Sequence, residues 1–509
     1  MLDRLRILVW ALAALALAAG PVIAFLNPTT DALLVFATAA VLLTPVVVRA
    51  VQGRFDPFEP MFIFVMAYGV MFVVRPAAML VRNEMEFSIA FQGVDLESTF
   101  RPALVLGLLG AIGFVTGYFL RATERLAARV KAPPDANLDR VVLAAFGLWI
   151  LGACLYGIFL LTSADGGSVI ALVFSGRSLQ LTQAYQNSSA YLYSSPFLMV
   201  SATLILFGVG LARRSARLLW TAAASTALLC ILLGPVGSRT VLFPLLLGLG
   251  VIFYTTRGTR PRAASLVVVT LLALFVSAVL LDVRSSYTRQ AIGVTSSIKE
   301  TAKDPLRIFD PLTTEHDAAE MPALAAALTV VPDEIGYKYG TGTLGDTLAR
   351  PIPRQVWSGK PRQPKEQVIS ALWPFLYDAG IANPEFSVLL NFFIDGSYPG
   401  VLLGMMLYGI LAGGLFRWFR RNAGSVGARV IFASILPFLV SGVRDTPVDT
   451  LMRLAFVSLP VAAIFYLAGR YAMAPSGAAG SGSVGPGLRP PGRARTITVR
   501  ASMTSSPSP

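Results

Sequence analysis

Long apolar segments recur along the chain, and short polar stretches separate them. A transmembrane helix needs roughly 20 apolar residues to cross about 30 Å of hydrocarbon, and this pattern predicts about twelve spans. They cover residues 7–26, 32–48, 60–81, 103–120, 141–161, 191–212, 218–233, 240–254, 263–281, 398–416, 430–443 and 450–467. The first resembles a signal peptide, but its apolar run is long and another span follows closely, so we interpret it as an uncleaved helix. The pattern predicts an all-α, polytopic integral membrane protein.

One polar segment is much longer than the others. Residues 282–397 separate the ninth and tenth spans, and we predict that they form a large extracytoplasmic loop. After residue 471 the chain consists largely of Gly, Ser, Pro and Arg, which bury too little apolar surface to fold. The predicted organisation is spans at 1–281, the loop at 282–397, further spans at 398–470 and a disordered cytoplasmic tail at 471–509.

Lys and Arg are distributed unevenly between alternate short loops. One set of loops is poor in them and includes an acidic stretch at residues 84–97. The other set contains Arg49, Arg54, Arg121, Arg125, Arg129, Lys131, Arg140, Arg213, Arg214, Arg217, Arg257, Arg260, Arg262, Arg417, Arg420, Arg421 and Arg429. Cytoplasmic loops carry the excess of Lys and Arg, and every basic loop falls on the N-terminal side. Both termini are therefore predicted to be cytoplasmic.

The composition supports the membrane interpretation and excludes several other functions. Hydrophobic residues form 55% of the chain and charged residues 14%, whereas soluble proteins average about 25% charged. The net charge of +14 does not indicate nucleic-acid binding, because the excess lies in short loops and the tail, where topology and anionic lipid explain it. Cys154 and Cys230 lie in apolar spans and His316 is the single histidine, which argues against a disulfide framework and a zinc site.

A smaller set of cations lies where cations are normally scarce, in the predicted outward loops or inside spans. These residues are Arg75, Arg177, Arg239, Arg350, Arg354, Lys360, Arg444 and Arg453. Placing cations against the orientation bias costs free energy, so we expect them to have anionic partners. We therefore take them as candidate ligands of a pyrophosphate or a glycan.

The outward turn at residues 234–240 has the elements of a phosphate site. Two glycines and a proline make a tight bend, and Ser238 is a suitable N-cap for the helix that follows. The N-terminus of that helix, with Arg239 beside it, favours bound phosphate. The alternative is an interfacial arginine that snorkels from a hairpin.

The outward turn before the last span carries Arg444 and a regular charge pattern. If a helix begins near Asp445, then Asp445, Asp449 and Arg453 recur at four-residue spacing on one face. Arg453 would then lie inside the span, where an ionisable group indicates function. The alternative is a self-neutralising Asp–Arg ladder that fixes helix packing.

Two further arginines lie in less specific surroundings. Arg75 precedes Pro76, which loosens the helix, and we expect it to pair with a headgroup, with Asp445 or with a substrate phosphate. Snorkelling to the interface is the alternative. Arg177 begins a loop in which tyrosines alternate with Gln and Asn, a composition that suits sugars but also an interfacial aromatic belt.

The long loop also carries candidate bases. The proline-punctuated stretch at residues 350–365 is expected to be extended and to present its cations along a groove or a lipid surface. Glu385 and Asp395 follow it, and burial in a shielded site would raise the pKa of either carboxylate. The alternative is a pair of solvated carboxylates near the start of a helix.

Metal and nucleotide chemistry have little support. Residues 315–317 (Glu-His-Asp) and Glu320 are potential ligand types, but one histidine in a polar loop is more typical of a surface. We find no Asp-x-Asp pair and no phosphate-binding P-loop. The sequence therefore predicts metal-independent phosphate chemistry on the outer face, with arginines as the positive charges and no cofactor.

The chain resembles the bacterial O-antigen polymerase family over roughly residues 54–470. The likeness consists of the plan of about twelve spans and several short sequence patterns. These are the Gly237-Ser-Arg239-Thr turn, the Pro351-Ile-Pro-Arg354…Lys360-Pro361 run, the Glu385…Asn391…Gly400 segment and the Arg444-Asp445 turn.

The resemblance implies a glycosyltransferase on the outer face of the bacterial cytoplasmic (inner) membrane. Such enzymes transfer a growing glycan from one undecaprenyl pyrophosphate carrier to a lipid-linked repeat unit. The implied partners are undecaprenyl-pyrophosphate-linked oligosaccharides and membrane lipids, with flippase and chain-length regulator proteins as further candidates. Related ligases generally have a functional histidine in the large outer loop, and the polar context of His316 favours a polymerase.

In this chemistry the outward cations neutralise the charge that develops on the pyrophosphate leaving group. The cations are Arg239, Arg354 and Arg444, with Lys360 or Arg453. Glu385 is the first candidate, and Asp445 the second, for the base that deprotonates or orients the attacking sugar hydroxyl. A single-displacement, inverting transfer is the simplest mechanism.

A transporter or flippase for a lipid-linked or anionic substrate is the main alternative. Arginines inside spans would then line a translocation path. However, the cations gather at the outer face rather than the midplane, and the two halves show no repeat. A structural protein that recruits glycan-assembly partners would need no converging charges.

Overall fold

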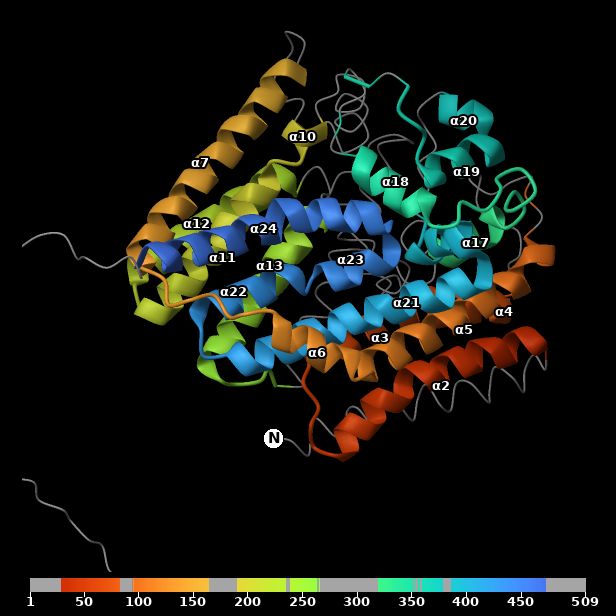
Figure 1. Cartoon of the computed structure of the whole chain (residues 1–509), viewed down its shortest axis with the longest axis horizontal. Helices are drawn as coiled ribbons and strands as arrows, with labels where there is room; N and C mark the ends of the chain where they lie inside the picture. Colours follow the sequence, from red (N-terminus) through yellow and green to blue (C-terminus); the bar gives the residue numbers. More distant parts are fainter. Residues whose placement is uncertain are drawn as a thin grey trace, which may run out of the picture. The chain divides into compact units, whose positions relative to one another are not determined.

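The computed structural model describes residues 29–82, 94, 96–163, 190–234, 239–262, 265, 319–350, 352, 356–357, 359–378 and 386–472. Within these ranges every regular element is a helix and no strand is present (Figure 1). Nine helices in this part of the chain are long and apolar enough to cross a membrane. The all-α prediction is therefore confirmed for the described residues, which contain the helices of a multi-pass membrane protein.

Each of the nine long helices coincides with a predicted span. They are α2 (Thr30–Val51), the run Pro60–Val81, α5 (Glu97–Phe119), α7 (Leu138–Ser163), the run Tyr191–Arg213, α12 (Ala216–Leu233), α13 (Arg239–Arg257), α21 (Val388–Asn422) and α24 (Pro447–Ala472). The predicted spans 7–26 and 263–281 lie outside the described residues, apart from residue 265. Residues 473–509, which include most of the predicted tail, also lie outside them.

The predicted start of the tenth span, at residue 398, coincides with a kink inside a longer helical segment. The helix α21 begins at Val388, because Phe392, Phe393 and Ile394 extend the apolar pattern into the segment assigned to the loop. Its backbone breaks at Gly396 and Ser397, where Ser397 has a φ of 55°. The Gly-Ser-Tyr-Pro sequence therefore marks a kink within a helix rather than the end of a loop.

The predicted continuous span 430–443 is wrong. The chain forms two shorter helices there, α22 (Val426–Ile435) and α23 (Phe438–Arg444). Pro437 lies between them and has no backbone N–H to donate to the preceding turn, so it interrupts the helix. The turn that precedes α24 is consequently carried by a short, separate helix.

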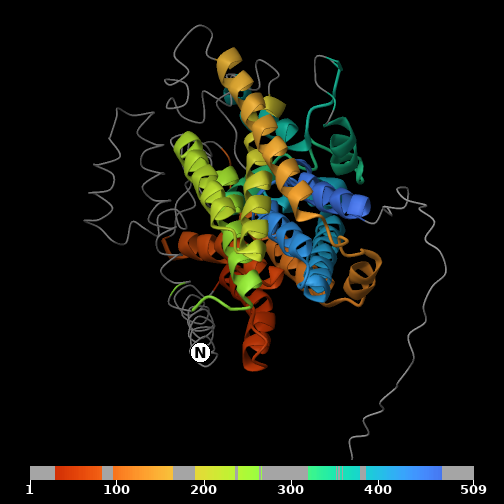
Figure 2. The ribbon, with the colours of Figure 1, turned by 90° about the vertical axis from the view of Figure 1, so that its left-hand side faces the viewer.

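The helix α11 (Pro196–Arg213) lies at the centre of one group of helices. It packs against α7, α12, α13, α22 and α24, which is seen from the side in Figure 2. Its residues from Pro196 to Leu206 are all buried, so it is enclosed on every side. A helix that is apolar all round is expected at the core of a bundle.

The helices α5 and α21 form the most extensive contact of a second group. Glycines allow their backbones to approach, because a Cβ on Gly117 would lie 2.0 Å from the carbonyl oxygen of Met406. A Cβ on Gly409 would likewise lie 2.2 Å from the carbonyl oxygen of Phe114. Small residues at such crossings are typical of helix pairs in membranes.

Part of the predicted loop folds into helices that cover one end of this bundle. These are α17 (Glu320–Ala327), α18 (Thr341–Ala349), α19 (Pro364–Leu372) and α20 (Pro374–Asp378). They lie where α21 and α24 begin, and α18 contacts both (Figure 1). All residues of α17 are buried against α5, α21 and the π-helical segment η1 (Val70–Val74). The described part of this segment is therefore a packed cap on the bundle.

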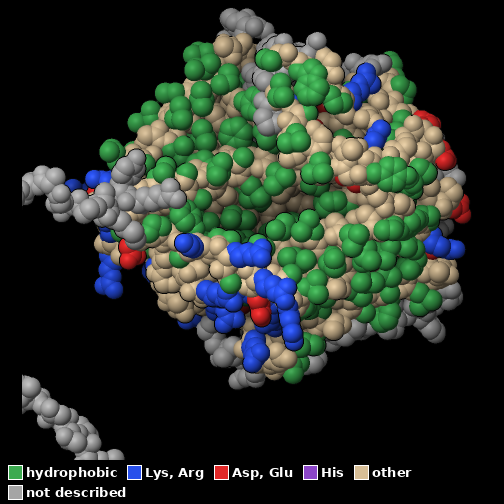
Figure 3. Space-filling view, in the orientation of Figure 1, with side chains coloured by type: hydrophobic (Ala, Val, Ile, Leu, Met, Phe, Trp, Pro, Cys, Tyr) green, Lys and Arg blue, Asp and Glu red, His purple; other side chains and the backbone are tan. Residues whose placement is uncertain are grey.

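Basic side chains gather at the other end of α21, where α6 (Ala122–Arg129) packs against it. Figure 3 shows this concentration of Lys and Arg on the lower part of the molecule. Exposed members in this region are Arg54, Arg121, Arg125, Arg129, Arg420 and Arg421. The bundle therefore has one strongly basic end, and the capped end lies opposite along α21.

Candidate functional site

Charged side chains from separate segments meet at the capped end of the bundle. We call this group the α18–α24 cluster, and its members are Asp346, Arg350, Lys360, Lys365, Asp445, Asp449 and Arg453. They come from α18, the segment between α18 and α19, the start of α19, the turn between α23 and α24, and the first turns of α24. Segments that are distant in sequence thus place both signs of charge in one small region.

Asp449 lies at the centre of the cluster. Its Oδ1 accepts a hydrogen bond of 2.6 Å from Nη2 of Arg350, and its Oδ2 accepts one of 3.0 Å from Nζ of Lys365. All three side chains are at least four-fifths shielded from solvent. Asp449 also stands in the first turn of α24, where a negative charge is favoured by the helix dipole. One carboxylate therefore joins α18, α19 and α24.

Asp395 holds the beginning of α18 in place. Its Oδ1 accepts a hydrogen bond of 3.0 Å from the backbone N–H of Gly342, and its Oδ2 accepts one of 3.1 Å from Thr343. The preceding Gly340 has a φ of 84°, a conformation that favours glycine. The carboxylate that we considered as a base thus serves as a cap for the orphan N–H groups of a helix.

The other end of α18 is held by Lys360. Its Nζ donates hydrogen bonds to the carbonyl oxygens of Arg350 and Ile352, at 3.3 and 3.1 Å. Tyr191, at the start of the run that contains α11, donates a hydrogen bond of 2.6 Å to the same carbonyl of Arg350. Lys360 and Tyr191 therefore fix the backbone from which the Arg350 side chain reaches Asp449.

The predicted ladder on one face of α24 is only partly correct. The helix begins at Pro447, whose fixed φ suits a first helical position, and Asp445 lies before it in an extended conformation. Thr446 is the residue that caps the helix, since its Oγ1 accepts a hydrogen bond of 3.1 Å from the N–H of Asp449. Asp449 and Arg453 share a helical face, whereas Asp445 reaches Arg453 from the turn and forms an ion pair with it.

Arg444 turns toward the buried helix α17 rather than toward the centre of the cluster. Its Nε lies 2.8 Å from Oε1 of Glu320, a residue that is only 1% exposed. We expected Glu320 to lie on a polar surface, and its burial corrects that expectation. The apolar, alanine-rich sequence of α17 is what carries this carboxylate into the core.

Arg75 is also buried, with 1% exposure. It directly follows η1, and its backbone N–H donates to the carbonyl of Val70, five residues earlier. Pro76 has no N–H, so the local hydrogen-bond register must change there, and a π-helical turn accommodates that change. Burial inside the protein excludes snorkelling to the surface.

The remaining predicted site residues are placed less fully. Arg239 is the first residue of α13, so a helix does begin at this turn, but its side chain lies outside the described part of the structure. Arg177, Arg354 and Glu385 also lie outside the described residues. Three of the predicted arginines, Arg350, Arg444 and Arg453, each pair with a carboxylate.

Asp346 and Lys365 are members of the cluster that the sequence analysis did not select. Asp346 lies one turn before Arg350 on α18, and burial raises the pKa of its carboxyl, an effect that Asp449 reinforces and Arg350 opposes. Lys365 follows Pro364 at the start of α19. In the sequence, only the four-residue spacing between Asp346 and Arg350 could have indicated that Asp346 belongs to the cluster.

No protein-family model, curated protein or solved structure matches this chain. The cluster therefore supplies the chemistry from which a function is inferred. It combines arginines, which bind phosphate oxygens through a planar fork, with carboxylates that hold them in place. A doubly charged phosphate group can compete with a single carboxylate for such cations.

Proposed function

We propose that the chain polymerises undecaprenyl-pyrophosphate-linked oligosaccharide repeat units into a surface polysaccharide. The observation that carries the proposal is the meeting of Arg350, Lys360, Asp445 and Arg453 in one cluster at one end of the bundle. Arg350 and Lys360 were selected from the long predicted loop, whereas Asp445 and Arg453 come from the last outward turn and the span that follows it. Nine apolar helices provide the membrane setting that a lipid-linked substrate requires.

The two ends of the bundle differ in charge, which indicates the side of the membrane that each end faces. Basic residues gather at the end where α21 meets α6, and the α18–α24 cluster lies at the opposite end (Figures 1 and 3). Because cytoplasmic loops carry the excess of Lys and Arg, we assign the basic end to the cytoplasm. The cluster then faces outward, with both termini in the cytoplasm of a bacterium and a cap formed by the large extracytoplasmic segment.

The cations of the cluster would act on the leaving group. A hydroxyl oxygen of the acceptor sugar forms a bond to the anomeric carbon of the donor glycan, and the bond from that carbon to the pyrophosphate breaks. Undecaprenyl pyrophosphate leaves with the electron pair, and Arg350, Lys365 and Arg453 would neutralise its charge. In this scheme Asp449 and Asp445 hold the guanidinium groups in position until the pyrophosphate displaces them.

The proton of the attacking hydroxyl passes to a carboxylate in the same scheme. Glu385 remains the first candidate for this base, as the sequence analysis proposed, and Asp445 the second. Asp445 is already engaged by Arg453, which favours a positioning role for it when no substrate is bound. Asp346 is an additional candidate, because its burial favours proton uptake at the edge of the cluster.

Reconstitution in liposomes tests the proposal. The purified protein would be mixed with undecaprenyl-pyrophosphate-linked oligosaccharides extracted from host cells that lack this protein. The lipid-linked products would then be separated by size. We expect a ladder of longer glycans, with the rate reduced about 100-fold or more in Arg350→Lys, which keeps the charge but loses the planar fork. Arg101→Gln, which removes an exposed cation paired with Asp31, serves as the matched control.

Two results would overturn the proposal. The first is an undiminished ladder in both Arg350→Lys and Arg350→Gln, which would exclude the cluster from the reaction. The second is movement of the lipid-linked oligosaccharide across the bilayer without any lengthening, which would establish the transporter or flippase alternative.

A further inference from the structure

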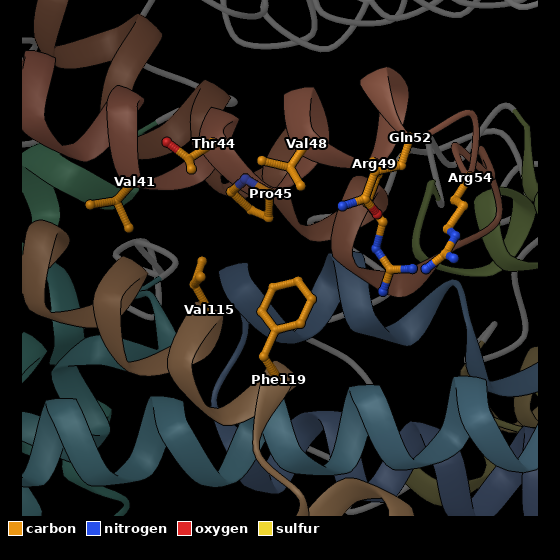
Figure 4. Close-up of a pocket in the computed structure, with 9 residues that line it drawn as sticks. All are labelled: Val41, Thr44, Pro45, Val48, Arg49, Gln52, Arg54, Val115 and Phe119. Carbon is orange, nitrogen blue, oxygen red and sulfur yellow. The ribbon is translucent and has the colours of Figure 1, made fainter.

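A pocket of about 640 Å³ opens between α2 and α5 at the basic end of the bundle, remote from the α18–α24 cluster. Five of its lining residues are apolar, and three of the others form its polar end. Figure 4 shows the apolar residues on two facing helices, α2 and α5, and Arg49, Gln52 and Arg54 together at one end. The apolar residues are Val41, Pro45, Val48, Val115 and Phe119. The pocket is thus amphipathic, with a long apolar part and a cationic end.

One of the two arginines is held firmly by the protein. Nη2 of Arg49 lies 3.2 Å from Oε1 of Glu59, and its guanidinium carbon lies 5.7 Å from the centre of the Phe119 ring. Glu59 is only 3% exposed and also accepts a hydrogen bond of 2.9 Å from the hydroxyl of Tyr118. The charge of Arg49 is therefore balanced inside the protein, and its position is fixed.

The second arginine, Arg54, has a charge that no such carboxylate pair balances among the described residues. Arg54 is exposed, and its guanidinium has no carboxylate partner in the described part of the chain. Asp56, the nearest acidic residue in sequence, pairs instead with Arg260 at 2.6 Å. Figure 4 shows the side chains of Arg49 and Arg54 pointing toward one another, an arrangement that a shared anion would stabilise. One positive charge is left over at the end of the pocket.

We propose that this pocket binds one anionic diacyl phospholipid, with its phosphate at Arg54 and Arg49 and an acyl chain between the apolar residues of α2 and α5. A phosphodiester carries a single negative charge, which matches the surplus left by the Arg49–Glu59 pair. Val48 and Phe119 are substantially exposed on the outer surface of candidate spans, so an acyl chain can reach them from the surrounding bilayer. The site is independent of the reaction assigned to the opposite end of the molecule.

Lipid retention measured by native mass spectrometry tests this assignment. The delipidated full-length protein would be titrated with phosphatidylglycerol and, separately, with phosphatidylcholine of the same chain length. We expect phosphatidylglycerol to bind more tightly, and Arg54→Gln to weaken its binding about fivefold, as the loss of one interfacial cation predicts. Arg214→Gln, which removes an exposed arginine outside the pocket, should leave the binding unchanged.

A second variant examines the apolar part of the pocket. Val48→Trp narrows the apolar part of the pocket without changing any charge. Because Val48 is 46% exposed, the larger side chain does not disturb the core. It should also weaken binding of phosphatidylglycerol. Equal binding of the two lipids, or equal losses in Arg54→Gln and Arg214→Gln, would overturn the inference. So would displacement of the lipid by inorganic phosphate alone, since the occupant would then be a free anion.

Discussion

Nη2 of Arg350 lies 2.6 Å from Oδ1 of Asp449, although the two residues are 99 positions apart in the sequence. Lys365 donates to the second oxygen of the same carboxylate, so Asp449 is an anionic partner that these two cations share. This arrangement ties the cap to the start of α24. A phosphate that binds here would have to replace Asp449 as the anionic partner of Arg350 and Lys365.

Loss of the Asp449 charge should destabilise the fold strongly. Asp449→Asn leaves Arg350 and Lys365 close together and largely shielded from water, and breaking a buried pair in this way costs about 3–5 kcal/mol. Thermal unfolding of the purified protein in detergent would measure the change. Asp31→Asn provides the comparison, because its partner Arg101 is 58% exposed and solvent screens that pair. Equal shifts in the two variants would contradict a central role for Asp449.

The pair of Arg444 and Glu320 should be coupled energetically. Arg444→Met removes a cation from a carboxylate that is 1% exposed, and we expect the free energy of unfolding to fall by about 2 kcal/mol or more. Adding Glu320→Gln to the same chain removes the buried charge and should restore part of the loss. A double-mutant cycle on the unfolding free energies measures this coupling. Simple additivity of the two effects would show that the groups do not interact.

The membrane helices could be predicted from the sequence because the bilayer imposes a length and a composition on each span. The nine described long helices all coincide with predicted spans for this reason. The break at Pro437 was a missed local signal, since a proline inside an apparent span removes a helical hydrogen bond. The early start of α21 was hidden by the turn-like Gly396-Ser397 sequence, which the structure uses as a kink.

The candidate site was predictable only in part. Arg350, Lys360 and Arg453 were selected because cations are disfavoured where the topology places them. Their carboxylate partners could not be assigned in the same way, because the Arg350–Asp449 pair depends on how α18 packs against α24. The burial of Glu320 likewise depends on the packing of the whole of α17.

The close crossing of α5 and α21 should be sensitive to a single methyl group. In Gly117→Ala the new Cβ would lie 2.0 Å from the carbonyl oxygen of Met406, so the helices must separate. Overpacking of this kind costs about 1–3 kcal/mol. The yield of monodisperse protein and its unfolding temperature would both fall.

Gly147→Ala is the matched control for this crossing. Gly147 lies on α7 with nothing within 4 Å of a built Cβ, so only the helix preference for Ala over Gly operates there. That preference stabilises a helix by about 0.5–1 kcal/mol. A Gly117→Ala protein as stable as the Gly147→Ala protein would contradict the close approach of α5 and α21.

Asp346 should make the stability of the fold depend on pH. Burial raises the pKa of this carboxyl, Asp449 and Glu366 add to the effect, and Arg350 and Lys360 oppose it. A raised pKa in the folded state means that the fold favours the protonated carboxyl. Its contribution to stability is fully present below the ordinary aspartate value of 3.8, and it is lost as the pH rises through the higher folded value.

Asp346→Asn carries a side chain that stays neutral at every pH, so it should escape this loss. The unfolding temperature of the wild-type protein should therefore fall relative to that of Asp346→Asn as the pH is raised from acid toward neutral. Thermal unfolding of both proteins across that range measures the difference. Asp333→Asn removes a charge of the same sign from an exposed position outside the cluster. A pH-dependent difference of the same size in that variant would mean that removal of any carboxylate has this effect, and that burial of Asp346 is not its cause.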